Sequence, residues 1–112
     1  MKRLSPLRIQ DIKENVNKII INTKDISENE FYENDILYSA VLRWLELIGE
    51  AAKYVDEETK KLYPDIPWKM MAAMRDVAIH DYAELLQKRI WETIKQDIPK
   101  LKMQVEKIKP AH

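Results

Sequence analysis

Residues 37–55 read LYSAVLRWLELIGEAAKYV, and this stretch decides the fold class. Its apolar side chains recur at alternating steps of four and three residues, which is the spacing of a helix face that packs against other helices. The members of this seam are Leu37, Val41, Trp44, Ile48, Ala51 and Val55, with Leu45 and Ala52 beside them. Because Ser27 and Glu30 have capping-box spacing, we expect one long helix from there to about residue 55.

The only glycine of the chain, Gly49, lies inside this predicted helix. Glycine in a helix interior costs about 1 kcal/mol relative to alanine. A close approach of a second helix would offset that cost. We therefore expect Gly49 to have a packing role.

The remaining sequence is helical in pattern as well, with prolines at the predicted boundaries. Further helices are predicted over 6–25, 57–63, 67–79, 81–96 and 99–109. One glycine in 112 residues disfavours β-hairpins and glycine-rich phosphate loops, and the absence of cysteine excludes disulfides and thiolate sites. We predict a single domain, 1–112, that is an all-α antiparallel bundle of four long helices and one or two short ones.

Charge and hydropathy restrict the partners. The 19 basic and 19 acidic side chains give a net charge of zero, which argues against a general nucleic-acid coat but leaves room for a local basic patch. No targeting segment or membrane-spanning stretch is recognisable. We expect a soluble cytoplasmic protein that does not associate with membranes.

The stretch RDVAIHDY, residues 75–82, holds the side chains best suited to chemistry. Arg75 supplies a fixed cation, His80 a titratable imidazole and Tyr82 a phenol, a set that suits a phosphodiester substrate. The chain has no motif for a metal ion, so neither a metal site nor a cofactor is predicted. The simpler interpretation is structural, with His80 at the edge of an apolar stripe, Arg75 in a surface ion pair and Tyr82 in the core.

Helix geometry constrains a joint site. On an unbroken helix Arg75 and Tyr82 lie about 20° apart, whereas Arg75 and His80 lie about 140° apart. A site that uses both Arg75 and His80 therefore needs a bend near residues 79–82 or a second copy of the chain.

The string Arg75–(four residues)–His80-Asp81-Tyr82 resembles the RX4HXY signature of the HEPN superfamily, and the chain is similar to its HepT branch from about residue 7 to 102. Further matching segments are Phe31, Ile48-Gly49-Glu50-Ala51-Ala52, Pro64-Asp65-Ile66-Pro67-Trp68, Met74-Arg75-Asp76, Trp91-Glu92-Thr93-Ile94 and Ile98-Pro99-Lys100-Leu101. The chain departs from many relatives in having no glycine after Tyr82.

This resemblance implies a dimeric helical bundle that acts as a metal-independent endoribonuclease, the toxin of a toxin–antitoxin pair. Arg75 would bind the scissile phosphate, His80 would act as general acid/base, and Asp76 would position one of them. Tyr82 would be the residue to which a cognate MntA-like nucleotidyltransferase antitoxin attaches AMP, and the added charge and bulk would block RNA.

Two other interpretations remain open. The bundle could be a non-catalytic binding or regulatory partner of a nucleotidyltransferase, or a purely structural dimer. Smaller expectations concern single residues: Glu50 could pair with Arg75, Trp44 and Trp68 could anchor the core or a dimer interface, and the five lysines after residue 94 could contact phosphate.

Overall fold

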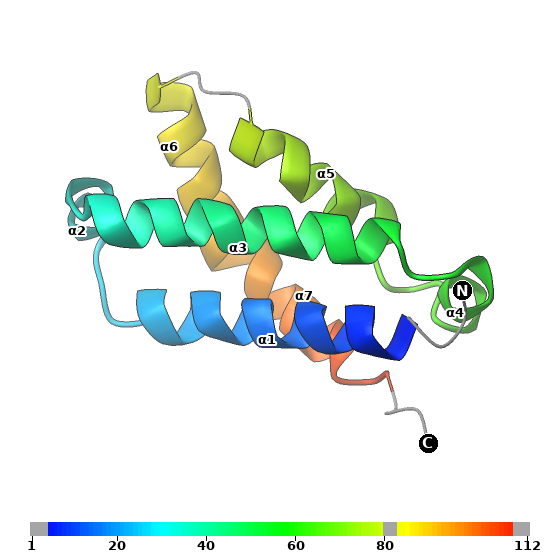
Figure 1. Cartoon of the computed structure of the whole chain (residues 1–112). Coiled ribbons are helices and arrows are strands. Elements are labelled where there is room, and N and C mark those ends of the chain that lie inside the picture. The colour runs from blue at the N-terminus through cyan, green and yellow to red at the C-terminus, as the bar shows by residue number, and fades with distance from the viewer. Residues whose placement is uncertain (1–4, 80–82, 109–112) are drawn as a thin grey trace.

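All regular secondary structure in the described part of the computed structural model, residues 5–79 and 83–108, is helical (Figure 1). The helices are α1 (Ser5–Thr23), α2 (Glu28–Glu33), α3 (Asp35–Lys53), α4 (Glu57–Leu62), α5 (Trp68–Ile79), α6 (Ala83–Glu92), the π-helical η2 (Thr93–Asp97) and α7 (Ile98–Val105). None of these helices is long and apolar enough to cross a membrane. The prediction of an all-α bundle is confirmed.

The long helix α3 is the centre of the bundle. It runs antiparallel to α1 on one side and to α5 on the other, and its contact with α5 is the most extensive between any two helices (Figure 1). The run from α6 through η2 to α7 crosses behind α3 in this view, and α7 packs on α1. The protein is therefore built from four long rods, three of which are nearly side by side.

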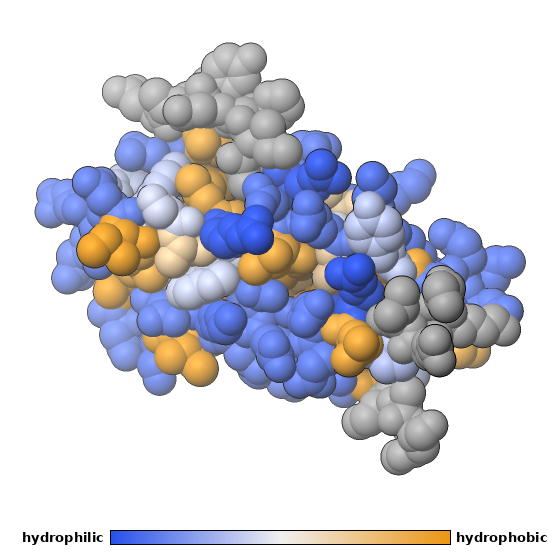
Figure 2. All heavy atoms as spheres, in the orientation of Figure 1, coloured by the Kyte–Doolittle hydropathy of each residue, from blue (hydrophilic) through white to orange (hydrophobic). Residues whose placement is uncertain are grey.

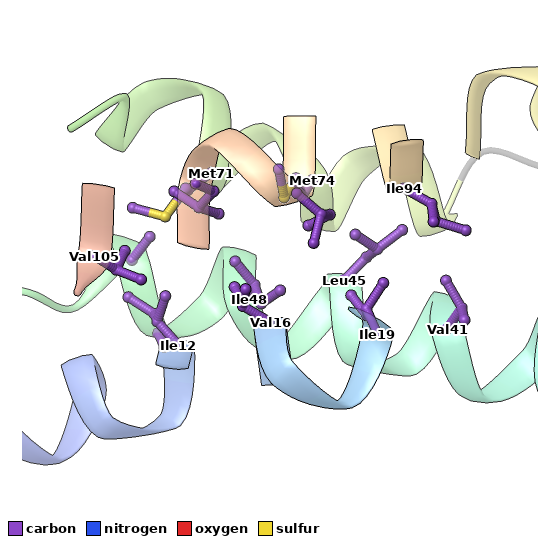
Figure 3. Close-up of a cluster of buried hydrophobic side chains, with 14 of the residues drawn as sticks. Ile12, Val16, Ile19, Val41, Leu45, Ile48, Met71, Met74, Ile94 and Val105 are labelled. Carbon is purple, nitrogen blue, oxygen red and sulfur yellow. The ribbon is translucent and has the colours of Figure 1, made fainter. Parts of the chain in front are cut away.

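The seam residues of α3 point into a core that every long rod shares. Val41, Leu45 and Ile48 are fully buried, and Figure 3 shows them facing side chains of α1, α5, η2 and α7. The facing residues labelled there are Ile12, Val16, Ile19, Met71, Met74, Ile94 and Val105. Trp44 and Trp68 are half-buried and pack against this core, as expected for anchoring aromatics.

The prediction of one continuous helix from the capping box to residue 55 was wrong. Ser27 and Glu30 do form a capping box, but it starts the short helix α2. Asn34 then takes an extended conformation, with φ −96° and ψ 90°, and its side chain accepts a hydrogen bond from the N–H of Leu37 at 3.0 Å. A new N-cap therefore begins α3, because Asn offers the backbone a partner outside the helix.

The separation of two final helices near Pro99 was also wrong. Asp97 and Ile98 keep helical dihedral angles, so α6, η2 and α7 are one rod that contains a π-helical turn. The N–H of Ile98 bonds the carbonyl of Thr93, five residues back. Proline lacks an N–H and its ring collides with the carbonyl four residues earlier, and the wider π turn relieves that collision. The rod ends at Val105 rather than at residue 109.

Lysines join α1 to the C-terminal rod. Lys95 donates to the carbonyl of Thr23 at 2.9 Å, where the last turn of α1 leaves carbonyls without helical partners. Lys102 donates to Asn17 at 2.7 Å, and Lys13 donates in the other direction to the carbonyl of Ile108 at 2.9 Å. Two of the five lysines expected to contact phosphate therefore bond other parts of the protein.

Candidate active site

Arg75 lies on α5 at a close approach to α3. A Cβ atom built on Gly49 would be 2.7 Å from the backbone nitrogen of Arg75, 2.8 Å from its Cβ and 3.1 Å from the carbonyl oxygen of Ala72. Only glycine allows two helix backbones to approach this closely. The predicted packing role of Gly49 is thus confirmed, and its partner is the arginine of the candidate site.

The face of α5 that carries Arg75 is held by buried neighbours. Met71 and Met74 are buried against α3, whereas Arg75 is half-buried and Asp76 is exposed. Consecutive helical residues point about 100° apart, so Arg75 emerges beside the α3–α5 contact and Asp76 points to solvent. Both methionines therefore serve as core packing.

The guanidinium of Arg75 has no carboxylate within ion-pair distance among the described residues. The expected pair with Glu50 does not form. Glu50 instead lines a cavity of about 250 Å³ between α1 and α3, together with Asn15 and Lys18. This cavity does not include Arg75.

The start of α5 is fixed by the loop before it. The indole of Trp68 donates to the carbonyl oxygen of Tyr63 at 3.1 Å, and the N–H of Met71 bonds the carbonyl of Pro67 at 3.0 Å. Pro67 suits the position before the first helical turn because it lacks the N–H that would have no partner there. These contacts set the register of α5 and hence the position of Arg75.

His80 and Tyr82 lie outside the described residues. The helices on either side of them are described: α5 ends at Ile79, α6 begins at Ala83, and these two helices point in different directions (Figure 1). Arg75 is thus one turn before the end of α5, at the end of the bundle where α6 starts. The described residues contain no group of three or more His, Cys, Asp or Glu that could hold a metal ion.

The surface around this region is mixed in character. Figure 2 shows the α1–α3 face as mostly hydrophilic, with scattered apolar residues. Large apolar side chains with high exposure include Leu7, Ile21, Ile36 and Leu62. These four side chains lie on three different helices, α1, α3 and α4.

The all-α bundle and the place of Arg75 at a tight helix contact agree with the resemblance that the sequence shows. Over residues 12–108 the chain matches the family described as ribonuclease HepT-like. The chain therefore belongs to the HepT-like ribonuclease family.

Individual relatives agree with this family over nearly the whole chain. A protein of Thermococcus cleftensis with the name "Probable ribonuclease HepT" is 40% identical over 109 residues, 97% of this chain and 99% of its own. A protein of Methanocaldococcus jannaschii with a provisional RNase name is 41% identical over 98 residues, 88% of this chain and 90% of its own. No solved structure matches the chain.

The direct contact between Gly49 and Arg75 was not foreseen from the sequence. A lone glycine in a helical seam indicates that some backbone comes close. Which residue that is depends on how far α5 slides along α3, and neither segment contains that information by itself.

Proposed function

We propose that the protein is a metal-independent endoribonuclease that works as a homodimer and acts as the toxin of a toxin–antitoxin pair. One observation carries the proposal: the half-buried guanidinium of Arg75 has no described carboxylate partner, in a chain of the HepT-like ribonuclease family. Such a cation binds phosphate oxygens in a bidentate fork and stabilises the charge that develops during cleavage.

In the proposed reaction the RNA supplies its own nucleophile. The 2′-oxygen forms a bond to the adjacent phosphorus, the bond from phosphorus to the 5′-oxygen breaks, and a cyclic phosphate and a 5′-hydroxyl result. One His80 imidazole accepts the proton of the 2′-hydroxyl, and a protonated His80 gives a proton to the leaving oxygen. Arg75 neutralises the phosphorane oxygens, and Asp76 orients His80 or Arg75.

A homodimer would bring Arg75 and His80 into one site. On one straight helix Arg75 and His80 would diverge by about 140°. A cleft formed by two copies of residues 75–82 would let an arginine of one protomer meet a histidine of its partner. RNA contact would then be confined to that cleft, consistent with a net charge of zero over the whole chain.

Control of the toxin would come from modification of Tyr82 by a cognate MntA-like nucleotidyltransferase. The phenol oxygen would attack the α-phosphorus of a nucleoside triphosphate, pyrophosphate would leave, and the phenol proton would pass to solvent. The attached AMP adds negative charge and bulk where the RNA phosphate would bind, so it would inhibit cleavage.

Incubation of the purified protein with end-labelled RNA in the presence of EDTA tests the ribonuclease. We expect cleavage by the wild type, none by His80→Ala and slow but measurable cleavage by Arg75→Ala, while Arg43→Ala, at an exposed position on α3, cleaves normally. Cleavage that persists in His80→Ala would contradict the mechanism. Stable binding to the nucleotidyltransferase without any RNA cleavage would favour the alternative, a non-catalytic regulatory partner.

The silencing step has its own test. After co-expression with the nucleotidyltransferase, mass spectrometry of the peptide that contains Tyr82 should show added AMP. Expression of the protein alone should arrest growth, and Tyr82→Phe should remain toxic in the presence of the transferase. Modification at another residue would contradict the assignment of Tyr82.

A further inference from the structure

We infer that Gly49 is a positioning residue for catalysis: by its lack of a side chain it sets where Arg75 stands relative to the RNA phosphate. This inference rests on the proposed ribonuclease function. It assigns a role to a residue on a different helix, 26 positions before Arg75 in the sequence and without catalytic chemistry of its own.

The atoms that surround Gly49 are ones that cannot rotate away. The nearest atoms to a built Cβ are the backbone nitrogen and the Cβ of Arg75, followed by the backbone carbonyl oxygen of Ala72. A flexible side chain could swing aside, but a helix backbone moves only as a unit. Any side chain at position 49 must therefore displace α5 itself or bend α3.

The size of that displacement follows from the distances. Ordinary van der Waals contact begins at 3.4 Å, whereas an added Cβ would be 2.7 Å from the Arg75 nitrogen. The backbone at Arg75 would have to retreat by about 0.7 Å. Misplacement of a catalytic group by about 1 Å costs about 100-fold in rate, so the shift is large enough to matter for catalysis.

The surrounding core resists a compensating shift elsewhere. Ile48, Met71 and Met74 are buried on either side of the contact. Protein interiors are packed to crystal-like density, so α5 cannot roll about this point without opening a gap beside one of these side chains. The part of α5 that carries Arg75 would therefore undergo most of the displacement.

The presence of glycine is itself informative, because glycine weakens a helix interior relative to alanine. Gly49 lies well inside α3, four residues before its end at Lys53. A helix with no need for close approach would be more stable with alanine there. The contact with α5 explains why the smaller residue is used.

A double-mutant cycle tests the positioning role. Gly49→Ala is expected to cleave RNA about 10- to 100-fold more slowly than the wild type, mainly through kcat. In the Arg75→Ala background, adding Gly49→Ala should cause no further loss, because the group that it misplaces is already absent. Val41→Ala serves as the control, since it opens a cavity in the same helix about 12 Å along the axis.

Amide chemical shifts provide a second readout that does not depend on activity. The amide signals of Ala72 and Arg75 should move in Gly49→Ala and stay in place in Val41→Ala. If Gly49→Ala does not fold in buffer, the assay is repeated with trimethylamine N-oxide, which favours the folded state. If Gly49→Ala remains unfolded in trimethylamine N-oxide, the Gly49 contact is needed for folding alone, and the positioning role is overturned.

The outcomes separate the two proposals. A wild type that does not cleave RNA overturns the proposed function, and with it any catalytic meaning of Gly49. A wild type that cleaves while Gly49→Ala cleaves equally fast, or loses the same factor with and without Arg75, overturns the inference and leaves the ribonuclease intact.

Discussion

The indole N–H of Trp68 donates a hydrogen bond to the backbone carbonyl of Tyr63, with 3.1 Å between the two atoms. This bond ties the first residue of α5 to the residue that follows α4. It spans the proline-flanked loop between them, so the helix that bears Arg75 starts at a fixed position.

Replacing Trp68 with phenylalanine is therefore expected to lower the free energy of unfolding by about 1 kcal/mol, the net value of one such hydrogen bond. Urea denaturation measures this change. Leu62→Ala, at an exposed position on α4, is the control and should change the free energy by less than about 0.5 kcal/mol. An unchanged urea midpoint in Trp68→Phe would contradict the role of the bond.

The cap at Asn34 is predicted to stabilise the start of α3 as a helix separate from α2. Asn34→Ala removes the acceptor for the Leu37 N–H and should cost about 1 kcal/mol of stability. Asn34→Asp keeps an acceptor oxygen and should retain the wild-type stability. Thermal unfolding followed by circular dichroism distinguishes the two, and equal melting temperatures for both variants would show that the cap contributes nothing.

The same cap shows where prediction from sequence reached its limit. The apolar period gave helices at nearly the observed places, because burial of one helix face dominates the energetics of a bundle. It did not reveal the break at Asn34, since Phe31 and Tyr38, seven residues apart, keep the helical spacing across it. The proline at position 99 led us to expect a second break, but a π turn keeps the rod continuous there.

The candidate site was predictable in its chemistry and not in its packing. Arg75 stands out because His80 and Tyr82 follow it within eight residues. Its burial, its lack of a described carboxylate partner and its contact with Gly49 depend on how α3 and α5 fit together. The way in which the surfaces of α3 and α5 interlock depends on both helices together. The residue pattern of one helix alone cannot predict it.

Acid should weaken the capping box at the start of α2. The Ser27 backbone N–H donates to the Glu30 carboxylate at 2.9 Å, and this bond, aided by the Ser27 hydroxyl, holds the pKa of Glu30 below its usual value of 4.5. A carboxyl with a lowered pKa in the folded state stabilises the fold above its unfolded pKa. That contribution is lost as the pH falls through the folded pKa.

Glu30→Gln tests this because it keeps the shape and removes the charge. We expect the wild type to be more stable than Glu30→Gln at neutral pH, and the difference to shrink at an acid pH below the folded pKa of Glu30. Denaturant unfolding at both pH values measures it. A difference of the same size at both would mean that ionisation of Glu30 plays no part in the cap.

Two apolar residues of α3 are predicted to differ sharply in their contribution to stability. Leu45 is fully buried in the shared core, whereas Ile36 is 86% exposed. Leu45→Ala should lower the free energy of unfolding by about 2–5 kcal/mol through lost burial and the cavity left behind. Ile36→Ala should change it by less than about 0.5 kcal/mol, and similar losses in the two variants would contradict the burial pattern.

Arg75→Lys separates the charge of Arg75 from its shape. Lysine keeps the positive charge but presents a single ammonium in place of the planar fork that grips two phosphate oxygens. We expect kcat for RNA cleavage to fall by about 100-fold, the usual cost of losing one donor to the transition state, with little change in KM. Arg43→Lys, the matched change at an exposed arginine of α3, should leave both constants unaltered. If Arg75→Lys cleaves as fast as Arg43→Lys, Arg75 contributes charge alone, and the bidentate contact with the scissile phosphate does not exist.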